Sequence, residues 1–404
     1  MASEWRQSTW GDEVSLEYGK GLRGYEDAVG PCRVYGSNGP VGWTKSSLAP
    51  GPGVILGRKG AYRGVEYSKE PFYVIDTAYW VKPKTILNMR WLYYAIKHHK
   101  LGEIDDGSPI PSTTRSAVYV RPLQVPPLDV QQRIADVLGK LDDKIELNRR
   151  MNRTLEKMAA AIFKSWFIVF DPVHAKADGR DTGLPAEIAD LFPDSFEESA
   201  LGPIPKGWSI GSLGDVADSP RRGVKPSDVP PTTPYIGLEH MPRRCIALDT
   251  WDRAEDVASG KSQFRQGEIL FGKLRPYFHK VGIAPVDGVC STDIVVVTPK
   301  TTHWHGYIIS LVSSKAFVDY TDSHSAGTKM PRTNWKDMSR YPLALPPVPL
   351  VKAFQEHVGA FHNHIILNVR QSRRLAGLRD TLLPKLISGE IDIPQAVSSN
   401  REAL

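Results

Sequence analysis

The sequence contains one pattern twice, and this repeat restricts the possible folds more than any other feature. A stretch from Pro126, PPLDVQQRIADVLGKLDDKIELNRRMNRTLEKMAAAIFKSWF, aligns without a gap with one from Pro346, PPVPLVKAFQEHVGAFHNHIILNVRQSRRLAGLRDTLLPKLI. The match extends upstream, where IPSTTRSAVYVRPLQVPP from Ile110 lies over MPRTNWKDMSRYPLALPP from Met330. The two copies are offset by 220 residues, and a period this long indicates a duplicated domain rather than a solenoid. We therefore expect a globular half followed by a long helix, twice.

Each globular half is predicted to mix strands, loops and short helices. Runs such as GVILGRKGAY and FYVIDTAYWV in the first half, and GEILFGKL and CSTDIVVVTP in the second, are β-rich and bounded by Gly and Pro. Short helices are expected at Met89–Lys97 and Tyr307–Phe317. The order of elements is retained between the halves, since WGD from Trp10 resembles LGD from Leu213.

The two long helices carry an apolar seam of the kind found in coiled coils. In the first helix, Leu138, Leu141 and Ile145 are spaced by three and four residues. A helix from Val130 to about Phe167 would be on the order of 55 Å long, the length of about sixteen base pairs of duplex DNA. The predicted fold class is α+β: two mixed α/β domains separated by two long helices that pack as an antiparallel coiled coil with a pseudo-twofold axis. The seam itself does not fix the direction of the second helix.

Local signals predict how these helices begin and end. Asp129 with Gln132 fits an N-cap and capping box at the start of the first helix. Pro349 is expected in the first turn of the second helix. Pro384 should kink or stop that helix.

Polar side chains occupy two positions of the seam, Asn148 and Asn152. The second copy has Asn368 and Ser372 at the same two places. A polar residue in such a seam can specify the register of a coiled coil at a cost in stability. We expect Asn148 and Asn368 to hydrogen-bond near the centre of the helix pair and to fix the slide between the helices. An irregular surface helix is the alternative.

Charge is distributed unevenly along the chain. The whole chain has a net charge of +6. Between Asp171 and Ala200 there are eight acidic and two basic residues, a net charge of −6, so the rest of the chain carries +12. Positive regions on both sides of an acidic linker suggest two surfaces for a polyanion, with ordinary scatter of surface charge as the alternative. The linker is polar and interrupted by prolines, and we expect it to let the second half turn back.

The chain has no feature typical of a secreted or membrane protein. Its three cysteines, Cys32, Cys245 and Cys290, are far apart and odd in number, which argues against a disulfide framework or a zinc site. No apolar run reaches transmembrane length, and the start MASEWRQSTW lacks the apolar core of a signal peptide. We expect a cytoplasmic protein without membrane contact.

Together these features resemble the specificity (S) subunits of Type I restriction–modification systems, the HsdS family. The most specific matches are the first long helix, the following FDPVHAKADGRDTGLPAEIADLFPDSFEESALGPIPKGW and the terminal LRDTLLPKLISGEIDIP. GPGVILGRKGAYRGVEYSKEPFYVIDTAYWV is similar to a target-recognition-domain segment of the family. The resemblance covers nearly the whole chain.

The resemblance implies a DNA-reading function. In this family each recognition domain reads one half of a split DNA target. The helices set the gap between the halves and bind two methyltransferase (M) subunits, which use S-adenosylmethionine to methylate adenine. Motor and nuclease (R) subunits then complete the restriction complex. The resemblance therefore implies that this chain is not an enzyme and binds no cofactor, and that S-adenosylmethionine is held by the partner methyltransferase.

The repeat also predicts the domain boundaries. The expected parts, in chain order, are a first target-recognition domain, a central helix, an acidic linker, a second target-recognition domain, a C-terminal helix and a tail: residues 1–125, 126–170, 171–203, 204–345, 346–390 and 391–404.

Motifs of DNA-acting enzymes are missing from the sequence. It contains no GxxxxGK[ST] phosphate loop, no Asn-Pro-Pro-aromatic run of adenine methyltransferases and no Asp…Glu-x-Lys nuclease pattern. The glycines of GPGVILGRKG precede a strand-like run, which does not fit a dinucleotide site. Two H-x-H pairs occur, at His303 and His305 and at His362 and His364. Residues i and i+2 do not share a helix face, and nothing indicates a third ligand, so we predict no metal site.

DNA reading requires side chains that reach base edges, while phosphate contacts position the protein. In each half, a Gly-rich segment and the loop before the Pro-Pro pair are predicted to supply them; solvated hairpins and ordinary turns are the alternatives. A smaller basic group at Arg221 has a counterpart at Lys20 and Arg23. The candidates in the first half are Lys45, Arg58, Lys59, Tyr62, Arg63, Ser112, Thr113, Thr114 and Arg115. Those in the second half are Arg221, Arg222, Lys225, Lys273, Arg275, Tyr277, Lys280, Lys329, Arg332, Thr333 and Asn334.

Two other functions stay open at this point. One is a structural coiled-coil adaptor, whose globular halves would show no salt-dependent DNA binding. The other is a standalone enzyme such as a nuclease, which would cleave plasmid DNA in the presence of magnesium.

Overall fold

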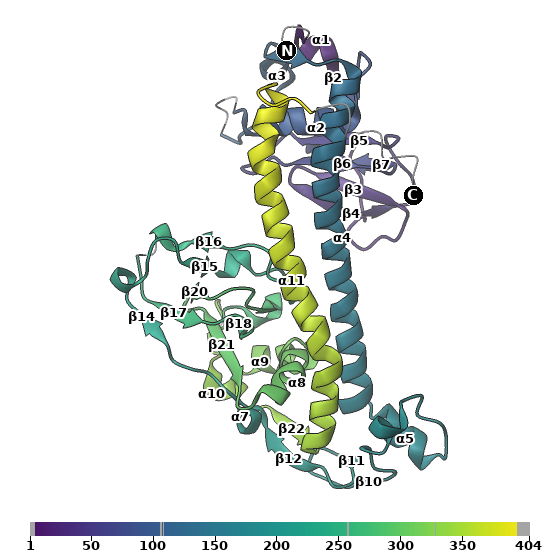
Figure 1. Cartoon of the computed structure of the whole chain (residues 1–404), viewed down its shortest axis with the longest axis vertical. Coiled ribbons are helices and arrows are strands. Elements are labelled where there is room, and N and C mark those ends of the chain that lie inside the picture. The colour runs from purple at the N-terminus through teal and green to yellow at the C-terminus, as the bar shows by residue number, and fades with distance from the viewer. Residues whose placement is uncertain (1–4, 106, 108, 257, 328, 394–404) are drawn as a thin grey trace. The chain divides into compact units, whose positions relative to one another are not determined.

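The computed structural model describes residues 5–105, 107, 109–256, 258–327 and 329–393. The chain forms two units. The first unit combines residues 1–144 with 375–404, and the second comprises residues 145–374. Each unit contains one globular half and a part of both long helices, α4 (Leu128–Phe167) and α11 (Val348–Ile387), which Figure 1 shows in blue and yellow.

The globular half of the first unit consists of short strands and three short helices. Its helices are α1 (Trp10–Glu13), α2 (Met89–His98) and α3 (Arg115–Tyr119). Its strands are β1 (Arg6–Thr9), β2 (Val14–Tyr18), β3 (Cys32–Gly36), β4 (Gly39–Thr44), β5 (Gly53–Gly57), β6 (Val65–Ser68), β7 (Phe72–Val74), β8 (Ala78–Pro83) and β9 (Pro122–Val125). They form an antiparallel sheet in the order β2-β8-β5-β6, a mixed sheet β4-β3-β7 and the pair β1-β9.

The second unit is also built from short strands and short helices, and it has more strands than the first. Its helices are α5 (Asp171–Ala177), α6 (Ala186–Ala189), α7 (Leu213–Val216), α8 (His305–Val312), α9 (Lys315–Ser323) and α10 (Trp335–Met338). Its strands are β10 (Phe196–Glu197), β11 (Ile204–Pro205), β12 (Ser209–Ser212), β13 (Ala217–Asp218), β14 (Gly223–Val224), β15 (Pro234–Ile236), β16 (Asp252–Arg253), β17 (Lys261–Phe264), β18 (Ile269–Gly272), β19 (Val281–Ile283), β20 (Gly288–Cys290), β21 (Ile294–Pro299) and β22 (Pro342–Leu345). The larger sheets have the orders β13-β21-β18-β19 and β14-β17-β20-β15-β16, beside the pairs β12-β22 and β10-β11.

The start and the end of each globular half are joined in the same way. In the first unit β1 pairs with β9, and the backbone N–H of Trp10 donates to the carbonyl of Arg121. In the second unit β12 pairs with β22, and the N–H of Leu213 donates to the carbonyl of Tyr341. The WGD and LGD segments lie at matching places in these closures, which confirms the predicted duplication at the level of individual hydrogen bonds.

Each half packs its apolar residues against its own part of the long helices. In the first unit, Leu138 of α4 is completely buried and joins a core with Trp91 of α2 and Leu386 of α11. In the second unit, Phe163 of α4 and Phe354 of α11 lie in one core with the sheet residues. Full burial of such a side chain contributes about 1.5–3 kcal/mol, so the long helices are part of both cores and not mere connectors.

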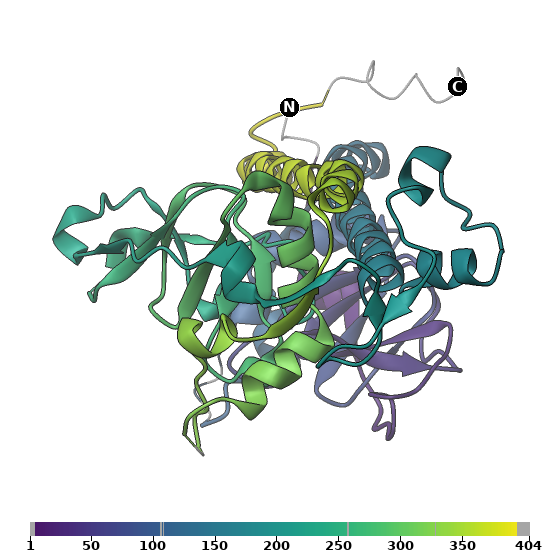
Figure 2. The same ribbon diagram turned by 90° about the horizontal axis from the view of Figure 1, so that it is seen from below.

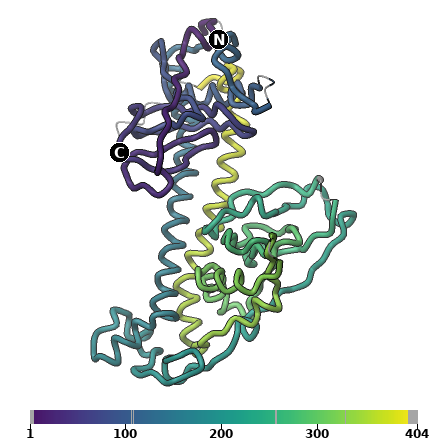
Figure 3. Tube along the Cα trace, turned by 180° about the vertical axis from the view of Figure 1, so that it is seen from behind, coloured from purple at the N-terminus to yellow at the C-terminus, as the bar shows by residue number. Residues whose placement is uncertain are grey.

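The two long helices run antiparallel in both units, as predicted. In the first unit Asp142 of α4 accepts a hydrogen bond of 2.7 Å from Arg379 of α11. In the second unit Asn148 faces Ser372, and the rings of Phe163 and Phe354 are 6.1 Å apart. Within each unit, residue numbers therefore rise along one helix and fall along the other, and the two tubes lie side by side there in Figure 3. Figure 2 shows the same ribbon from below.

The predicted capping box at Asp129 is wrong. Helix α4 begins one residue earlier, and the N–H of Gln131 already donates to the carbonyl of Pro127. Asp129 lies in the first turn and pairs with Arg133 at 2.7 Å. The Pro-Pro pair starts the helix without the cap, because proline has its backbone preset for the first turn.

Two other local predictions need correction, and two are confirmed. The helix expected at Tyr307–Phe317 is two helices, α8 and α9, because Ser314 caps α9 by accepting from the N–H of Phe317. Helix α11 continues through Pro384 to Ile387, since burial of Leu386 and Ile387 in the first unit's core holds its last turn. Helix α2 forms at the predicted place, and Pro349 lies in the first turn of α11.

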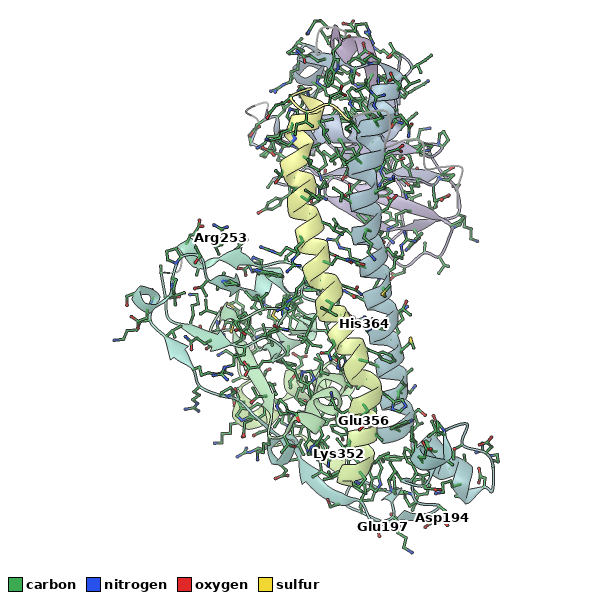
Figure 4. The ribbon with its side chains drawn as sticks, viewed as in Figure 1. Asp194, Glu197, Arg253, Lys352, Glu356 and His364 are labelled. Carbon is green, nitrogen blue, oxygen red and sulfur yellow. The ribbon has the colours of Figure 1, made fainter. Side chains whose placement is uncertain are left out.

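The acidic segment, residues 171–200, contains apolar side chains that pack into a core. Its apolar residues Val173, Ile188 and Phe192 are buried in the core of the second unit, where Phe192 contacts the ring of Trp166. The eight acidic side chains are all exposed, and Figure 4 labels two of them. The sequence signal was charge alone, and the apolar residues between the charges decide the fold of this segment.

None of the described helices is long and apolar enough to cross a membrane. The predicted tail, 391–404, falls mostly outside the described residues, which end at Ile393.

Candidate nucleic-acid interface

Two candidate segments that are distant in the sequence lie side by side in the first unit. Past the end of β5, the carbonyl of Arg58 accepts from the N–H of Thr113 at 2.9 Å, and the N–H of Gly60 donates to the carbonyl of Pro111 at 3.0 Å. Lys59 forms a β-bridge with Ser112 between these bonds. We call residues 58–60 and 111–113 the first strap.

The second unit builds the same strap from its own two candidate segments. The N–H of Thr333 donates to the carbonyl of Lys273 at 3.1 Å, and the N–H of Arg275 donates to the carbonyl of Pro331 at 2.8 Å. Leu274 and Arg332 form the β-bridge between them. Residues 273–275 and 331–333 are the second strap. Its bonds match those of the first strap one by one.

The matching bonds define which residues are equivalent. Arg58 corresponds to Lys273, and Gly60 corresponds to Arg275. Both Gly60 and Arg275 have a positive φ, of 114° and 52°. This backbone conformation is easy for glycine but costs another residue roughly 1–2 kcal/mol. The strap geometry is therefore kept in the second unit in spite of that cost.

Two arginines meet on one tyrosine beside the first strap. The guanidinium groups of Arg58 and Arg115 lie 5.0 and 4.2 Å from the ring centroid of Tyr18. The Nε of Arg115 also donates to the carbonyl of Leu16 at 2.7 Å, which fixes its orientation. Neither arginine forms an ion pair with a carboxylate of the described chain. Two cations that each lie within 5.0 Å of the same ring centroid, with no described carboxylate partner, favour an anion.

Tyr79 lies beneath the same arginines and keeps a neutral ring there. Its hydroxyl donates to the carbonyl of Thr113 at 3.2 Å. Burial raises the pKa of Tyr79 to about 12, so the phenol does not cancel the charge of Arg58 or Arg115 near neutral pH.

Three candidates of the first half are used inside the protein. Arg63 donates to the carbonyls of Gly60, Gly102 and Ile104. Thr113 is 1% exposed, and its hydroxyl faces carbonyl oxygens of the interior, which leaves it unavailable to DNA in this structure. Thr114 caps α3 by accepting from the N–H of Ala117. Arg63, Thr113 and Thr114 thus hold the loops of the first strap in place.

The other first-half candidates are open to solvent. Tyr62 is 77% exposed next to the strap, and Ser112 is partly exposed within it. The remaining cations, which include the two noted upstream, are exposed: Lys20, Arg23, Lys45 and Lys59.

The second strap differs from the first because its arginine is paired. The Nε of Arg332 donates to Asp293 at 3.2 Å, with about half of the arginine side chain exposed. The backbone of Arg332 exchanges two hydrogen bonds with Ala326, of 2.9 and 3.0 Å. Lys329, in the same loop, is exposed. At Arg332 the second strap therefore offers an oriented, partly neutralised guanidinium, which the first strap lacks.

Several second-half candidates have internal roles. Arg222 pairs with Glu268 at 2.5 Å, and Lys280 donates to the carbonyl of Leu238 at 2.5 Å. Burial lowers the pKa of Lys280. Thr333 is 2% exposed, like its counterpart Thr113, so its side chain is not available to DNA here. Asn334 caps α10 by accepting from the N–H of Asp337.

The structure does not bring all second-half candidates together. Arg221 and Lys225 are exposed beside β14, which belongs to the five-stranded sheet, whereas the strap follows β18 of the other sheet. Tyr277 is half exposed just after the strap, and Arg275 stacks over Phe278 at 5.9 Å.

Sequence reasoning missed two residues that contact strap arginines, Tyr18 and Asp293. Tyr18 ends β2, far from both candidate segments in the sequence, so only the fold brings it to Arg58. Asp293 lies in the run CSTDIVVVTP, just before β21. The sequence predicts a strand for that run, and an acidic residue is not among the side-chain types expected to contact DNA phosphates.

The four polar residues of the helix seam meet in the second unit. The amide of Asn148 donates to Gln371 at 2.9 Å, to the hydroxyl of Ser372 at 3.2 Å and to the carbonyl of Asn368 at 3.4 Å. Asn368 donates to Asn152 at 2.9 Å. All four seam residues are buried, at 9% exposure or less. Asn148 and Asn368 are therefore in contact through the backbone carbonyl of Asn368, and their role in fixing the slide between the helices stays a prediction.

The histidine pairs form no evident metal site. Within the described parts of the chain, no group of three or more His, Cys, Asp or Glu side chains could hold a metal ion. His305 and His362, from different pairs, approach each other with ring centroids 5.9 Å apart. Burial lowers the pKa of His362 to about 3, so this imidazole is neutral at physiological pH. It lines a cavity of about 360 Å³ together with Glu156 and Cys245.

The chain is similar to one family of DNA-recognition proteins. A family model described as the Type I restriction modification DNA specificity domain matches residues 34–157. The chain is 26% identical over 343 residues to the Type I restriction enzyme HindI specificity subunit of Haemophilus influenzae, covering 70% of this chain and 71% of the relative. It is 24% identical over 408 residues to the MjaIX specificity subunit of Methanocaldococcus jannaschii, covering 96% of this chain and 88% of that protein.

A solved structure shares the fold over nearly the whole chain. It is the S subunit of a Type I restriction–modification system from M. genitalium, with a TM-score of 0.57 and 15% sequence identity. The match covers 95% of this chain and 96% of that one. Two repeated globular halves on two long helices are therefore an architecture that occurs in a known protein.

Proposed function

The chain belongs to the family of Type I restriction specificity subunits, and we propose that each of its globular halves reads one half of a bipartite DNA target. The observation that carries this proposal is the strap. Each half holds two loops together by the same backbone bonds but presents different cations on them. A constant frame with variable side chains suits two readers of different sequences, since phosphate contacts position a protein and base contacts specify the sequence.

The long helices would set the spacer between the two half-targets. The polar residues of the seam support this role, because slipping α11 along α4 by one turn would bury their amides without partners. An unpaired buried polar group costs about 1–3 kcal/mol. The register of the two helices is thereby tied to the Asn148–Asn368 contact.

The partners follow from the same proposal. Two methyltransferase subunits would dock on the helices and hold S-adenosylmethionine, and motor and nuclease subunits would join them on double-stranded DNA. This chain would select the site and perform no chemistry itself.

Methylome sequencing of cells with and without the gene, in the presence of the methyltransferase subunit, tests the proposal. A bipartite adenine mark that depends on the gene is expected. A contiguous palindromic mark, or a mark that persists without the gene, would contradict it. Purified chain alone should methylate no DNA and should not cleave plasmid in magnesium.

A further inference from the structure

We propose that Arg332, oriented by Asp293, reads a guanine in the half-target of the second unit. The inference rests on the proposed function and adds the residue and the base. It is drawn from the one exposed strap arginine that has a carboxylate partner within the described residues.

The backbone of Arg332 is fixed from two sides. It is bridged to Leu274 across the second strap and exchanges hydrogen bonds of 2.9 and 3.0 Å with Ala326 on its other side. Its side chain is still about half exposed. A recognition residue needs a rigidly held backbone and an accessible side-chain end, because positional error weakens directional hydrogen bonds.

The guanidinium of Arg332 is held through its Nε atom alone. Its Nε donates to Asp293 Oδ1 at 3.2 Å, and both terminal nitrogens are left without a described acceptor. The free end of such a group is a planar fork of parallel N–H donors. Guanine presents two acceptors, N7 and O6, side by side in the major groove, and a bidentate arginine is its commonest partner.

Asp293 favours a base over a phosphate at this fork. Its carboxylate partly neutralises Arg332, and it would repel a phosphate brought to the same place. The second carboxylate oxygen can accept a hydrogen bond from cytosine N4, the group paired with guanine O6. Arg332 and Asp293 together match the two acceptors and one donor of a G·C pair in the major groove.

The first strap provides the contrast that supports this assignment. The N–H of Arg58 donates to the carbonyl of Thr77, and the N–H of Lys273 donates to that of Asp293 in the same way. Asp293 is therefore equivalent to Thr77, and Arg332 to Ser112. Both equivalent residues in the first unit are neutral, while its bare arginines, Arg58 and Arg115, lie elsewhere on Tyr18. Arginines without a carboxylate partner favour a phosphate, whereas an arginine oriented by a carboxylate favours the edge of a base.

The test measures binding of the assembled methyltransferase complex to its cognate duplex, with 7-deazaguanine, which lacks the N7 acceptor, placed at each guanine in turn. One guanine of the second half-target is expected to be sensitive, with binding weakened about 2- to 13-fold, which is half the free energy of a bidentate pair. Arg332→Ala should cause a larger loss, about 5- to 150-fold, and should make the complex insensitive to that substitution. Arg332→Lys keeps the charge and one possible donor to N7, so it should bind more weakly than the unaltered complex and retain only part of the sensitivity, because lysine lacks the rigid planar fork.

The substitution Asp293→Asn removes the carboxylate that orients Arg332 and leaves the arginine in place. It should reduce the preference for guanine over adenine at the same position while leaving the salt dependence of binding close to that of the unaltered complex. Arg340→Ala serves as the matched control, since Arg340 is exposed on the same unit but outside the strap. This control should bind as tightly as the unaltered complex and keep its sensitivity.

Two results would overturn the inference. One is a uniform loss across all sequences in Arg332→Ala with a shallower salt dependence, which identifies a phosphate contact. The other is a second half-target in which no guanine responds to removal of N7. Either result leaves a bipartite mark intact, whereas failure of the proposed function would remove the bipartite mark itself.

Discussion

The two straps have the same backbone and different charges. In the first, Arg58 and Arg115 stack on Tyr18 without a carboxylate partner in the described chain; in the second, Arg332 is held by Asp293. The shared hydrogen bonds show that the frame has been kept through the duplication, even where Arg275 must adopt a conformation suited to glycine. Because the frame is constant, differences in what the halves bind must come from the side chains placed on it.

One pair of equivalent positions in the long helices also carries different side chains on the same backbone. Asp142 and His362 occupy matching places in the repeat. Asp142 accepts hydrogen bonds from Tyr94 and Arg379, whereas His362 is buried as a neutral ring beside His305. The duplicated halves retained their backbone contacts and changed the side-chain pairs.

The largest expected effect is on DNA binding by the first strap. Arg58→Ala combined with Arg115→Ala should weaken binding about 100-fold, since a hydrogen bond to a charged group contributes about 1.5–3 kcal/mol. If these cations contact phosphates, the loss should be uniform across sequences, and the salt slope should fall by about 2. Titration of the complex with DNA at several salt concentrations measures both quantities. Arg180→Ala, in the acidic segment, is the control and should change neither. A loss confined to one target sequence would break the contrast between the straps.

The next effect concerns His362 and the pH dependence of stability. Its folded pKa of about 3 lies below the ordinary value of 6.5, so between these values the unfolded chain binds more protons. Keeping His362 neutral therefore contributes fully to the free energy of unfolding above pH 6.5. This contribution is lost as the pH falls toward 3, by about 1.4 kcal/mol per pH unit. His305, which faces the ring and also has a pKa lowered by burial, adds to this slope.

Chemical denaturation between pH 5 and 7.5 measures the slope. His362→Leu should flatten it by about one proton, while His305 and the half-buried His98 and His99 keep theirs. An unchanged slope in His362→Leu would contradict the assignment of a buried neutral imidazole.

A smaller effect is expected from the polar seam. Replacing both Asn148 and Asn368 with Leu removes the buried, unpartnered carboxamide oxygen of Asn148 but takes away the described partner of Asn152, so the stability of the helix pair should change by about 1 kcal/mol or less. The same change should loosen the register and broaden the spacer lengths accepted between the half-targets. Binding to a series of duplexes with altered spacers tests this. Retention of one preferred spacer would show that the asparagines do not set the distance between the readers.

The smallest effect compares equivalent caps. Thr114→Ala and Asn334→Ala each remove the side chain that caps the helix after a strap. Each should cost about 0.5–1 kcal/mol of unfolding free energy, measured by denaturation of the full chain. Similar values would support equivalent roles in the two frames, and a large difference would show that only one strap depends on its cap.

Several elements were predictable because they depend on residues close together in the sequence. The β-rich runs became β5, β8, β18 and β21, and helix α2 formed where its apolar pattern indicated. The capping box failed for the opposite reason, since several local signals competed and the Pro-Pro pair started α4 first. The packing of the acidic segment could not be predicted, because its few apolar residues, such as Phe192, show their role only when packed on the second unit.

The candidate interface was predicted in part. The sequence predicts the two loop segments of each half, but their pairing into straps depends on backbone bonds between residues distant in the sequence, such as Thr113 and Arg58, which are 55 positions apart. Burial then removed Thr113 and Thr333 from the accessible candidates, and hydrogen bonding gave Arg63 and Arg222 internal roles.

The sequence alone determined the duplication, the two long helices and the polar residues in their seam, because each is written as a periodic or repeated pattern of neighbouring residues. Only the tertiary structure decided which cations stand bare and which are paired. That choice depends on Tyr18 and Asp293, which reach the straps from distant strands. Charge pairing acts over a few ångströms in space, and no spacing along the chain encodes it.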